Sequence, residues 1–168
     1  MGLGPHDVAR SLFWMAASFM IGIFLIGVVA DRLQRRGIGP MTVLLGFVIA
    51  NLVAQAVIVL QVKGLAFAAW CVVSAAGQAA ILAYPWFAAR VGPGLAGRSN
   101  ATINFAMFLV AFAAQAFVGL VIGWFPQSAA GYDPHSYIWA FGLLLALEFL
   151  ALFWYLFVPL ASLKDETP

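Results

Sequence analysis

The sequence predicts an all-α integral membrane protein, a bundle of five transmembrane helices. Of its 168 residues, 65% are hydrophobic and only 8% are charged, whereas a soluble domain carries about 25% charged residues. Mean hydropathy is +1.03, and a soluble chain of this length buries only about 70% of its surface, too little to hide so many apolar side chains. Five apolar runs each reach the roughly 20 residues that a helix needs to cross the hydrocarbon core. The runs are continuous, without the alternation of a barrel strand, which favours helices.

The first two spans have recognisable starts. We expect Asp7 to cap the first span, which ends before Asp31, and Pro40 to occupy the first helical position of the second. The single predicted domain covers the whole chain, 1–168, with spans at about 8–30, 40–62, 64–89, 100–125 and 134–160.

Prolines mark the three later spans. Pro85 lies inside the third span and lacks a backbone N–H, which predicts a kink near Tyr84. The fourth span is expected to end at Pro126. Asp133 is expected to cap the fifth span, with Pro134 in its first turn.

The basic residues predict the orientation. Six of the eight Lys and Arg residues fall on one side of a five-span chain, and Arg10 and Lys63 fall on the other. Basic residues are retained on the cytoplasmic side, so we expect the N-terminus outside and the C-terminus in the cytoplasm. This pattern predicts a multi-pass membrane protein, and we expect it in a bacterial-type cytoplasmic (inner) membrane. The six residues are Arg32, Arg35, Arg36, Arg90, Arg98 and Lys164.

The loop after the first span contains a sequence pattern that a basic membrane anchor would not require. A glycine precedes an acid by four residues, and three arginines follow. This pattern resembles the loop motif of the major facilitator superfamily of secondary transporters, although Gln34 stands where the motif has its second glycine. The resemblance implies that the glycine allows close helix approach and that the acid makes a conformation-dependent contact. A helix stop with a basic anchor is the alternative. The residues are Gly27, Asp31, Arg32, Arg35 and Arg36.

Longer stretches extend the resemblance over essentially the whole chain. "ILAYPWFAARVGPGLAGRSNATINFAMFLVAFAAQAFVGLVIGWFP" is similar to the tenth span, loop and eleventh span of bacterial members, and "GYDPHSYIWAFGLLLALEFLALFWYL" to the last external loop and twelfth span. The resemblance therefore implies spans eight to twelve, a partial C-terminal half of this fold. Such transporters move a small solute by alternating access between two halves. Since five spans cannot enclose a two-sided cavity, the expected partner is the missing N-terminal half or another membrane polypeptide.

Several polar side chains lie within the spans. Trp70, Ser74 and Gln78 recur at four-residue steps, and the resemblance implies that this face lines the substrate path; interhelical hydrogen bonds are the alternative. The resemblance also implies that the fourth span lies at the contact between the two halves, so we expect a gating or packing role there, with substrate contact as the alternative for the two amides. The residues are Asn104, Gln115, Gly119 and Gly123.

Glu148 is the one acid inside a span. A charge there costs about 2.5–3.5 kcal/mol on insertion scales and marks a functional site by default, here a proton-coupling carboxylate with H⁺ as the coupling ion. A protonated Glu148 bonded to a neighbouring helix is the alternative. Asn51 and Gln55 share a face of the second span, where we expect a structural bond.

The sequence shows no catalytic triad, phosphate loop or metal-ligand cluster, so we expect no enzymatic activity, no cofactor and no metal. The basic residues are not grouped on a polar surface, so no nucleic-acid partner is expected. The expected partners are the lipid bilayer and a small-molecule solute. From another class of function, the alternative is a non-transporting small membrane protein, a remnant or accessory subunit that packs against a partner.

Overall fold

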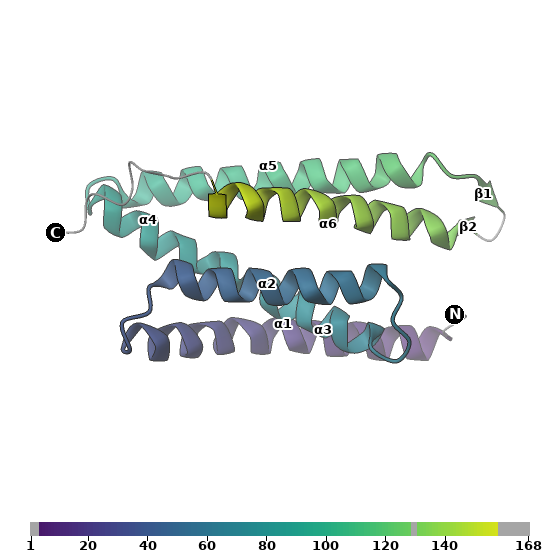
Figure 1. The fold of residues 1–168 in the computed structure, drawn as a ribbon, viewed down its shortest axis with the longest axis horizontal. Helices are drawn as coiled ribbons and strands as arrows, with labels where there is room; N and C mark the ends of the chain where they lie inside the picture. Colours follow the sequence, from purple (N-terminus) through teal and green to yellow (C-terminus); the bar gives the residue numbers. More distant parts are fainter. Residues whose placement is uncertain (1–3, 129–130, 158–168) are drawn as a thin grey trace.

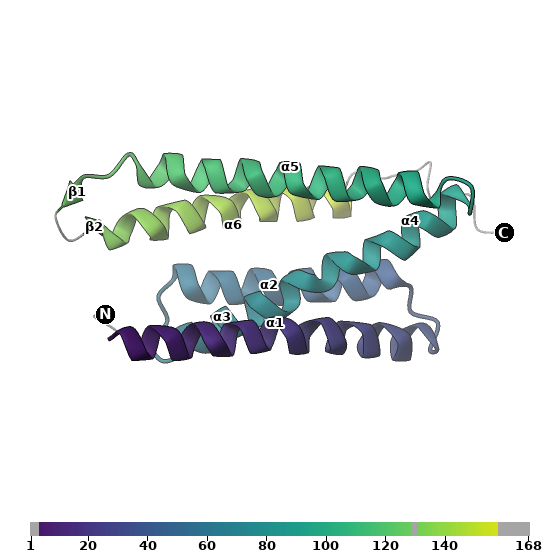
Figure 2. The ribbon, with the colours of Figure 1, turned by 180° about the vertical axis from the view of Figure 1, so that it is seen from behind.

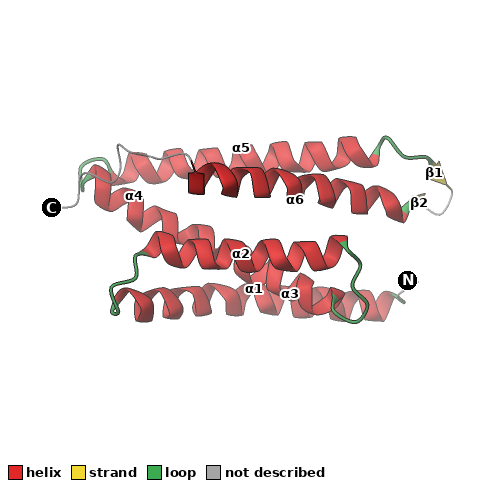
Figure 3. Ribbon diagram, viewed as in Figure 1, coloured by secondary structure: helices red, strands yellow, loops and turns green. Residues whose placement is uncertain are grey.

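A computed structural model describes residues 4–128 and 131–157, and it confirms the predicted fold class. Five helical spans are long and apolar enough to cross a membrane (Figures 1 and 3). A two-residue pairing joins β1 (Gln127–Ser128) to β2 (Gly131–Tyr132). The spans are α1 (Pro5–Gln34), α2 (Pro40–Val59), the composite Ala66–Val91, α5 (Ala96–Ile122) and α6 (Pro134–Phe157).

The third span is interrupted by a tighter turn. It consists of α3 (Ala66–Ala76), the 3₁₀ segment η1 (Gly77–Leu82) and α4 (Ala83–Val91). Pro85 has no N–H to donate to the carbonyl of Ile81, and its ring crowds that carbonyl, so the irregular backbone lies in the turns before the proline. The kink expected near Tyr84 is therefore spread over η1. Beyond it, α4 leaves α1 and runs towards α5 (Figure 2).

The helices form two groups that the third span connects (Figures 1 and 2). In one group, α3 packs against both α1 and α2. In the other, α5 packs against α6. The groups meet where α2 contacts α6 and where α4 contacts α5.

The connections alternate between the two ends of the bundle. Figure 1 shows the α1–α2 turn and the α4–α5 connection at one end, and the α2–α3 loop and the β1–β2 pairing at the other. All five arginines predicted to be cytoplasmic therefore share one end, as the positive-inside pattern requires. Lys164 lies outside the described residues.

The largest buried cluster joins α1, α2 and the third span. It consists of Ile26, Ala30, Val43, Ala79 and Leu82. Beside it, Gly22 lies so close to the third span that a Cβ on this glycine would stand 2.6 Å from the Cα and carbonyl oxygen of Ala75. Small residues allow this approach of two backbones, as is usual between membrane helices.

Most apolar side chains lie on the outside. The surface area is 12037 Å², whereas a soluble protein of this mass exposes about 8,000 Å². On α5 the exposed side chains include Phe105, Phe108 and Phe112, each about 70% exposed. Such faces are stable in contact with lipid tails or with other membrane helices, so the chain is a multi-pass membrane protein.

The helix starts match the expectations in part. Pro40 follows the N-cap Gly39 of α2, as predicted, and Asp133 Oδ1 accepts the backbone N–H of His135 at the start of α6, also as predicted. The cap predicted at Asp7 is wrong: α1 begins at Pro5, with Gly4 as its N-cap.

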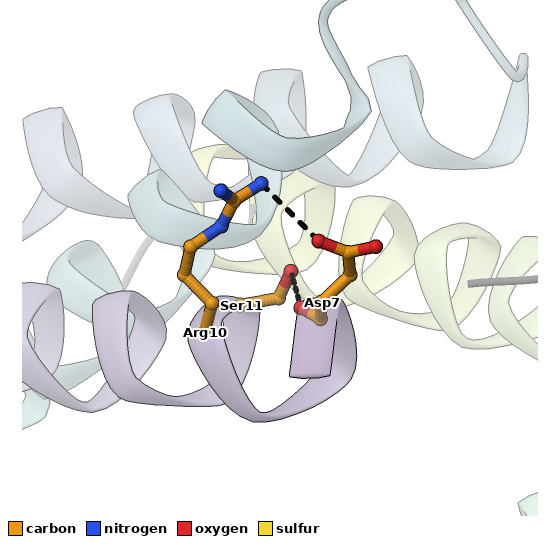
Figure 4. A network of polar contacts seen from close by, with 3 residues as sticks. All are labelled: Asp7, Arg10 and Ser11. Atoms are coloured by element: carbon orange, nitrogen blue, oxygen red, sulfur yellow. Dashed lines mark hydrogen bonds and ion pairs between the residues drawn. The ribbon is translucent and has the colours of Figure 1, made fainter. Parts of the chain in front are cut away.

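Asp7 instead lies in the first turn of α1. Its carboxylate stands 3.5 Å from Arg10, and its carbonyl accepts the hydroxyl of Ser11 (Figure 4). A proline at the first helical position already supplies the helical φ and needs no N–H partner, so the helix starts before the acid.

Candidate functional site

The contact between α2 and α6 holds a polar pair inside the span. The amide Nε2 of Gln55 donates a hydrogen bond of 2.6 Å to Oε2 of Glu148, and both side chains are partly buried. No ion pair joins Glu148 to a basic group within the part of the chain that the structure describes. This bond to α2 is the contact with a neighbouring helix that we gave as the alternative role of Glu148. The bond does not test proton coupling, which stays a prediction.

Two cavities adjoin this pair. One of about 170 Å³ lies towards the end of the bundle that holds the N-terminus, and one of about 690 Å³ extends from Glu148 towards the arginine-rich end. Glu148 lines both, so its carboxyl group stands between them. We call this region the α2–α6 seam and define it by Asn51, Gln55, Phe141, Leu144 and Glu148, which line these cavities.

Asn51 adds a second polar group to the seam. It lies one turn before Gln55 on α2, and its Oδ1 is buried without a hydrogen-bond donor among the described residues. A buried amide without a partner costs free energy, so such groups mark places that a ligand, water or moving group can satisfy. The structural bond expected at these two residues is made by Gln55 alone.

The predicted substrate-path face is divided between two regions. Trp70 lines the 170 Å³ cavity and meets Phe141 edge-on, with ring centroids 5.6 Å apart. Ser74 lies in a separate, open groove beside Met15 and Phe19 of α1. Successive four-residue steps turn by about 40° around a helix, and α3 is wedged between α1 and α2, so the two side chains meet different neighbours. Gln78 lies in η1, where 3₁₀ geometry changes the periodicity.

The fourth span shows one of its predicted polar contacts. The hydroxyl of Tyr84 in α4 donates to Oδ1 of Asn104 at 3.1 Å and lies 3.4 Å from the sulfur of Met107. Gln115 is exposed, and its side chain makes no hydrogen bond to any described residue. Asn104 therefore helps to hold α5 against the third span.

The two glycines of α5 contact no other helix in the described residues. A Cβ on Gly119 would meet nothing within 4 Å. Gly123 is the C-cap of α5, and its N–H donates to the Gly119 carbonyl. The helix approach that sequence reasoning missed lies at Gly22. Its signal is a four-residue repeat of Gly22, Ile26 and Ala30, all buried on α1.

The arginine-rich turn is exposed. Asp31 pairs with Arg35 across one turn of its own helix, at 3.0 Å, and Arg32 and Arg36 are exposed beside it. A Cβ on Gly27 would meet no atom within 4 Å, so the close approach expected there is absent from the described part of the chain. The Asp31–Arg35 pair instead supports the last turn of α1, which runs to Gln34.

A further arginine lies on an aromatic ring at the same end. The guanidinium of Arg90 stands 3.5 Å from the centre of the Trp86 ring. Cation–π contacts of this kind suit the membrane interface, where the ring is amphipathic and the charge remains hydrated. The pair lies near the end of α4, where the third span ends.

No group of three His, Cys, Asp or Glu side chains within residues 4–128 and 131–157 is placed to hold a metal ion. A scan against models of known protein families, a search of curated proteins and a search of solved structures each found no match to this chain. The functional argument therefore depends on the site itself.

Proposed function

We propose that the chain is the membrane-embedded C-terminal portion of a secondary transporter that moves a small solute by alternating access. The observation that carries the proposal is the Gln55–Glu148 bond between two cavities in the middle of the spans. A carboxyl group placed there can bind and release a proton as its surroundings change, which is how ion-coupled carriers use intramembrane acids. The resemblance of the loop at Gly27 and Asp31 to the major facilitator motif supports the same class.

In this proposal the second half of the carrier is another helical body in the membrane. Alternating access needs two bodies that rock around one site. The exposed face of α5, with its unbonded Gln115 amide, is where a second body would make polar contacts. The same exposed amide favours the second candidate function, a non-transporting membrane protein that packs against a partner, because an amide in hydrocarbon is stabilised by another helix.

The proposed location is a bacterial-type cytoplasmic membrane, with the arginine-rich end in the cytoplasm. Single cysteines placed at Gln34 and Gln61, in a Cys71→Ala background, test this orientation with a membrane-impermeant thiol reagent applied to intact cells. We expect labelling at position 61 and none at position 34 until the cells are opened. Labelling of position 34 in intact cells would invert the proposed topology.

Transport itself is tested in liposomes that hold the protein together with the membrane polypeptide that co-purifies with it, and that enclose a pH-sensitive dye. A panel of sugars, amino acids, organic acids and organic amines is added outside, and the internal pH is followed. We expect at least one class to move protons with the wild-type protein and not with Glu148→Gln. Asp7→Asn is the matched control, since it also removes one acid but at an exposed site. Equal proton movement in the Glu148→Gln variant would exclude Glu148 as the coupling group.

A further inference from the structure

The larger cavity of the α2–α6 seam has the size of a ligand site. Its volume of about 690 Å³ lies within the roughly 300–1,000 Å³ of small-molecule pockets. Its walls come from α2, the end of α3, η1, α5 and α6; they are mostly aliphatic, and the cavity is half open to the surface of the bundle. The apolar lining includes Leu44, Leu45, Val48, Val110 and Leu152.

The polar lining of this cavity is rich in acceptors. Glu148 accepts one hydrogen bond through Oε2, and no described residue donates to its Oε1. No described residue donates to the buried Oδ1 of Asn51 either. Among the described residues that line the cavity there is no Lys or Arg, and Tyr155 contributes the only hydroxyl. The cavity therefore combines a carboxyl group and an unsatisfied carbonyl with a large apolar wall.

We propose that this cavity binds an organic ammonium ion that carries an apolar body. The N–H groups of the ammonium would donate to Glu148 and to Asn51 Oδ1, while the apolar body lies against the aliphatic wall. The positive charge would neutralise the carboxylate, to which the described residues offer only the neutral amide of Gln55. The inference names the substrate class of the proposed carrier and rests on that function for its physiological meaning.

The depth of Glu148 favours a free amphiphile over a lipid headgroup. Glu148 follows Pro134 by fourteen residues and precedes Phe157 by nine, so it lies about 21 Å and 14 Å from the two ends of α6. The ammonium of a phospholipid stays at the interface with its phosphate. A small amine with an aromatic or aliphatic body can reach the middle of the span.

The test measures binding to the full chain in lipid nanodiscs, with empty nanodiscs subtracted. The probe is 4-phenylbutylamine, which carries an ammonium at pH 7 as lysine does, and 4-phenylbutanol is its neutral match. We expect saturable binding of the amine at least tenfold tighter than that of the alcohol. Glu148→Gln should remove this preference, while Asp7→Asn, which removes a half-exposed acid in the first turn of α1, away from the cavity, should keep it.

A second variant tests the cavity without altering the Glu148 carboxyl group. Gly77 lines the cavity, and a Cβ there would meet nothing within 4 Å, so Gly77→Leu adds bulk to the cavity without a backbone clash. We expect it to weaken amine binding at least tenfold. Gly46→Leu is the control, because Gly46 is equally open but does not line this cavity.

Three results would overturn the inference: equal binding of amine and alcohol, unchanged amine binding in Glu148→Gln, or unchanged amine binding in Gly77→Leu. Loss of amine binding when phosphatidylethanolamine replaces half of a phosphatidylglycerol bilayer would reassign the site to a lipid headgroup and also overturn it. Selective amine binding without any transport would support the inference while the proposed function fails. Proton-coupled transport of another solute without amine binding would support the proposed function and overturn this inference.

Discussion

Two helix contacts in this protein are built in opposite ways. Between α1 and α3, Gly22 and Ala75 bring two backbones together, and the nearby side chains of Ile26 and Ala76 are apolar and buried. Between α2 and α6, the α2–α6 seam holds a polar pair with a cavity on either side. A close-packed contact has one good arrangement, whereas a contact with space and a single polar bond can be rearranged at small cost. The first contact is suited to hold the fold, and the second to change during function.

The largest predicted effect is at the tight contact. Gly22→Ala would place a Cβ 2.6 Å from the Ala75 backbone, which has no flexible side chain to yield. We expect a loss of about 3 kcal/mol in the free energy of unfolding, the upper end of the cost of overpacking. The measurement is an SDS titration of the purified protein in detergent.

Gly27→Ala is the matched control for this prediction. It lies on the same helix with open space around it, and alanine favours a helix over glycine by up to about 1 kcal/mol. We therefore expect unchanged or slightly increased stability. Equal destabilisation by the two substitutions would mean that α1 and α3 are not in contact at Gly22.

A smaller effect is expected at the polar pair. Gln55→Leu leaves Glu148 without its donor and should cost about 1–2 kcal/mol, at the upper end for membrane hydrogen bonds. The double variant Gln55→Leu with Glu148→Leu should recover most of that loss, because both polar groups are gone. Gln115→Leu, at an exposed amide that bonds to no described residue, is the control and should change little. Additive losses in the double variant would argue against the bond.

The smallest effect is predicted where the two helix groups meet through α4 and α5. Tyr84→Phe removes the 3.1 Å bond to Asn104 and keeps the ring. The average membrane hydrogen bond contributes about 0.6 kcal/mol, and we expect a loss of that size in the same titration. A loss as large as that of Gln55→Leu would place the structural anchor here and weaken the contrast between the two contacts.

The spans could be predicted from the sequence because hydropathy and length alone define them. The helix starts at Pro40 and Asp133 were also predictable, since their signals are local. The division of Trp70 from Ser74 was not, because it depends on how α3 is wedged between two other helices. The glycine that matters for packing was misplaced for a similar reason. Gly27 stood in a recognisable loop motif, whereas the weaker signal of Gly22, its four-residue repeat with Ile26 and Ala30, gains its meaning only from the helix that lies opposite it.

The sequence identified Glu148 as a candidate but could not identify its partner. Its position inside a span marked it as a candidate, but only the fold brings Gln55 to it from ninety-three residues away along the chain. Asn51 became part of the site through its buried, unsatisfied oxygen, which has no signature in the sequence.

The central claim is that the α2–α6 seam is a working site and that Glu148 carries the coupled proton. The most direct measurement compares two kinds of flux in liposomes for Glu148→Gln: uptake driven by a pH gradient, and exchange of labelled for unlabelled solute at equal pH. Exchange needs no net proton transfer, so the account predicts that pH-driven uptake is lost, while exchange continues once the solute concentration is raised to offset the weaker binding expected without the carboxylate. Retention of pH-driven uptake at the wild-type level, or loss of both fluxes at saturating solute in a correctly folded variant, would contradict it.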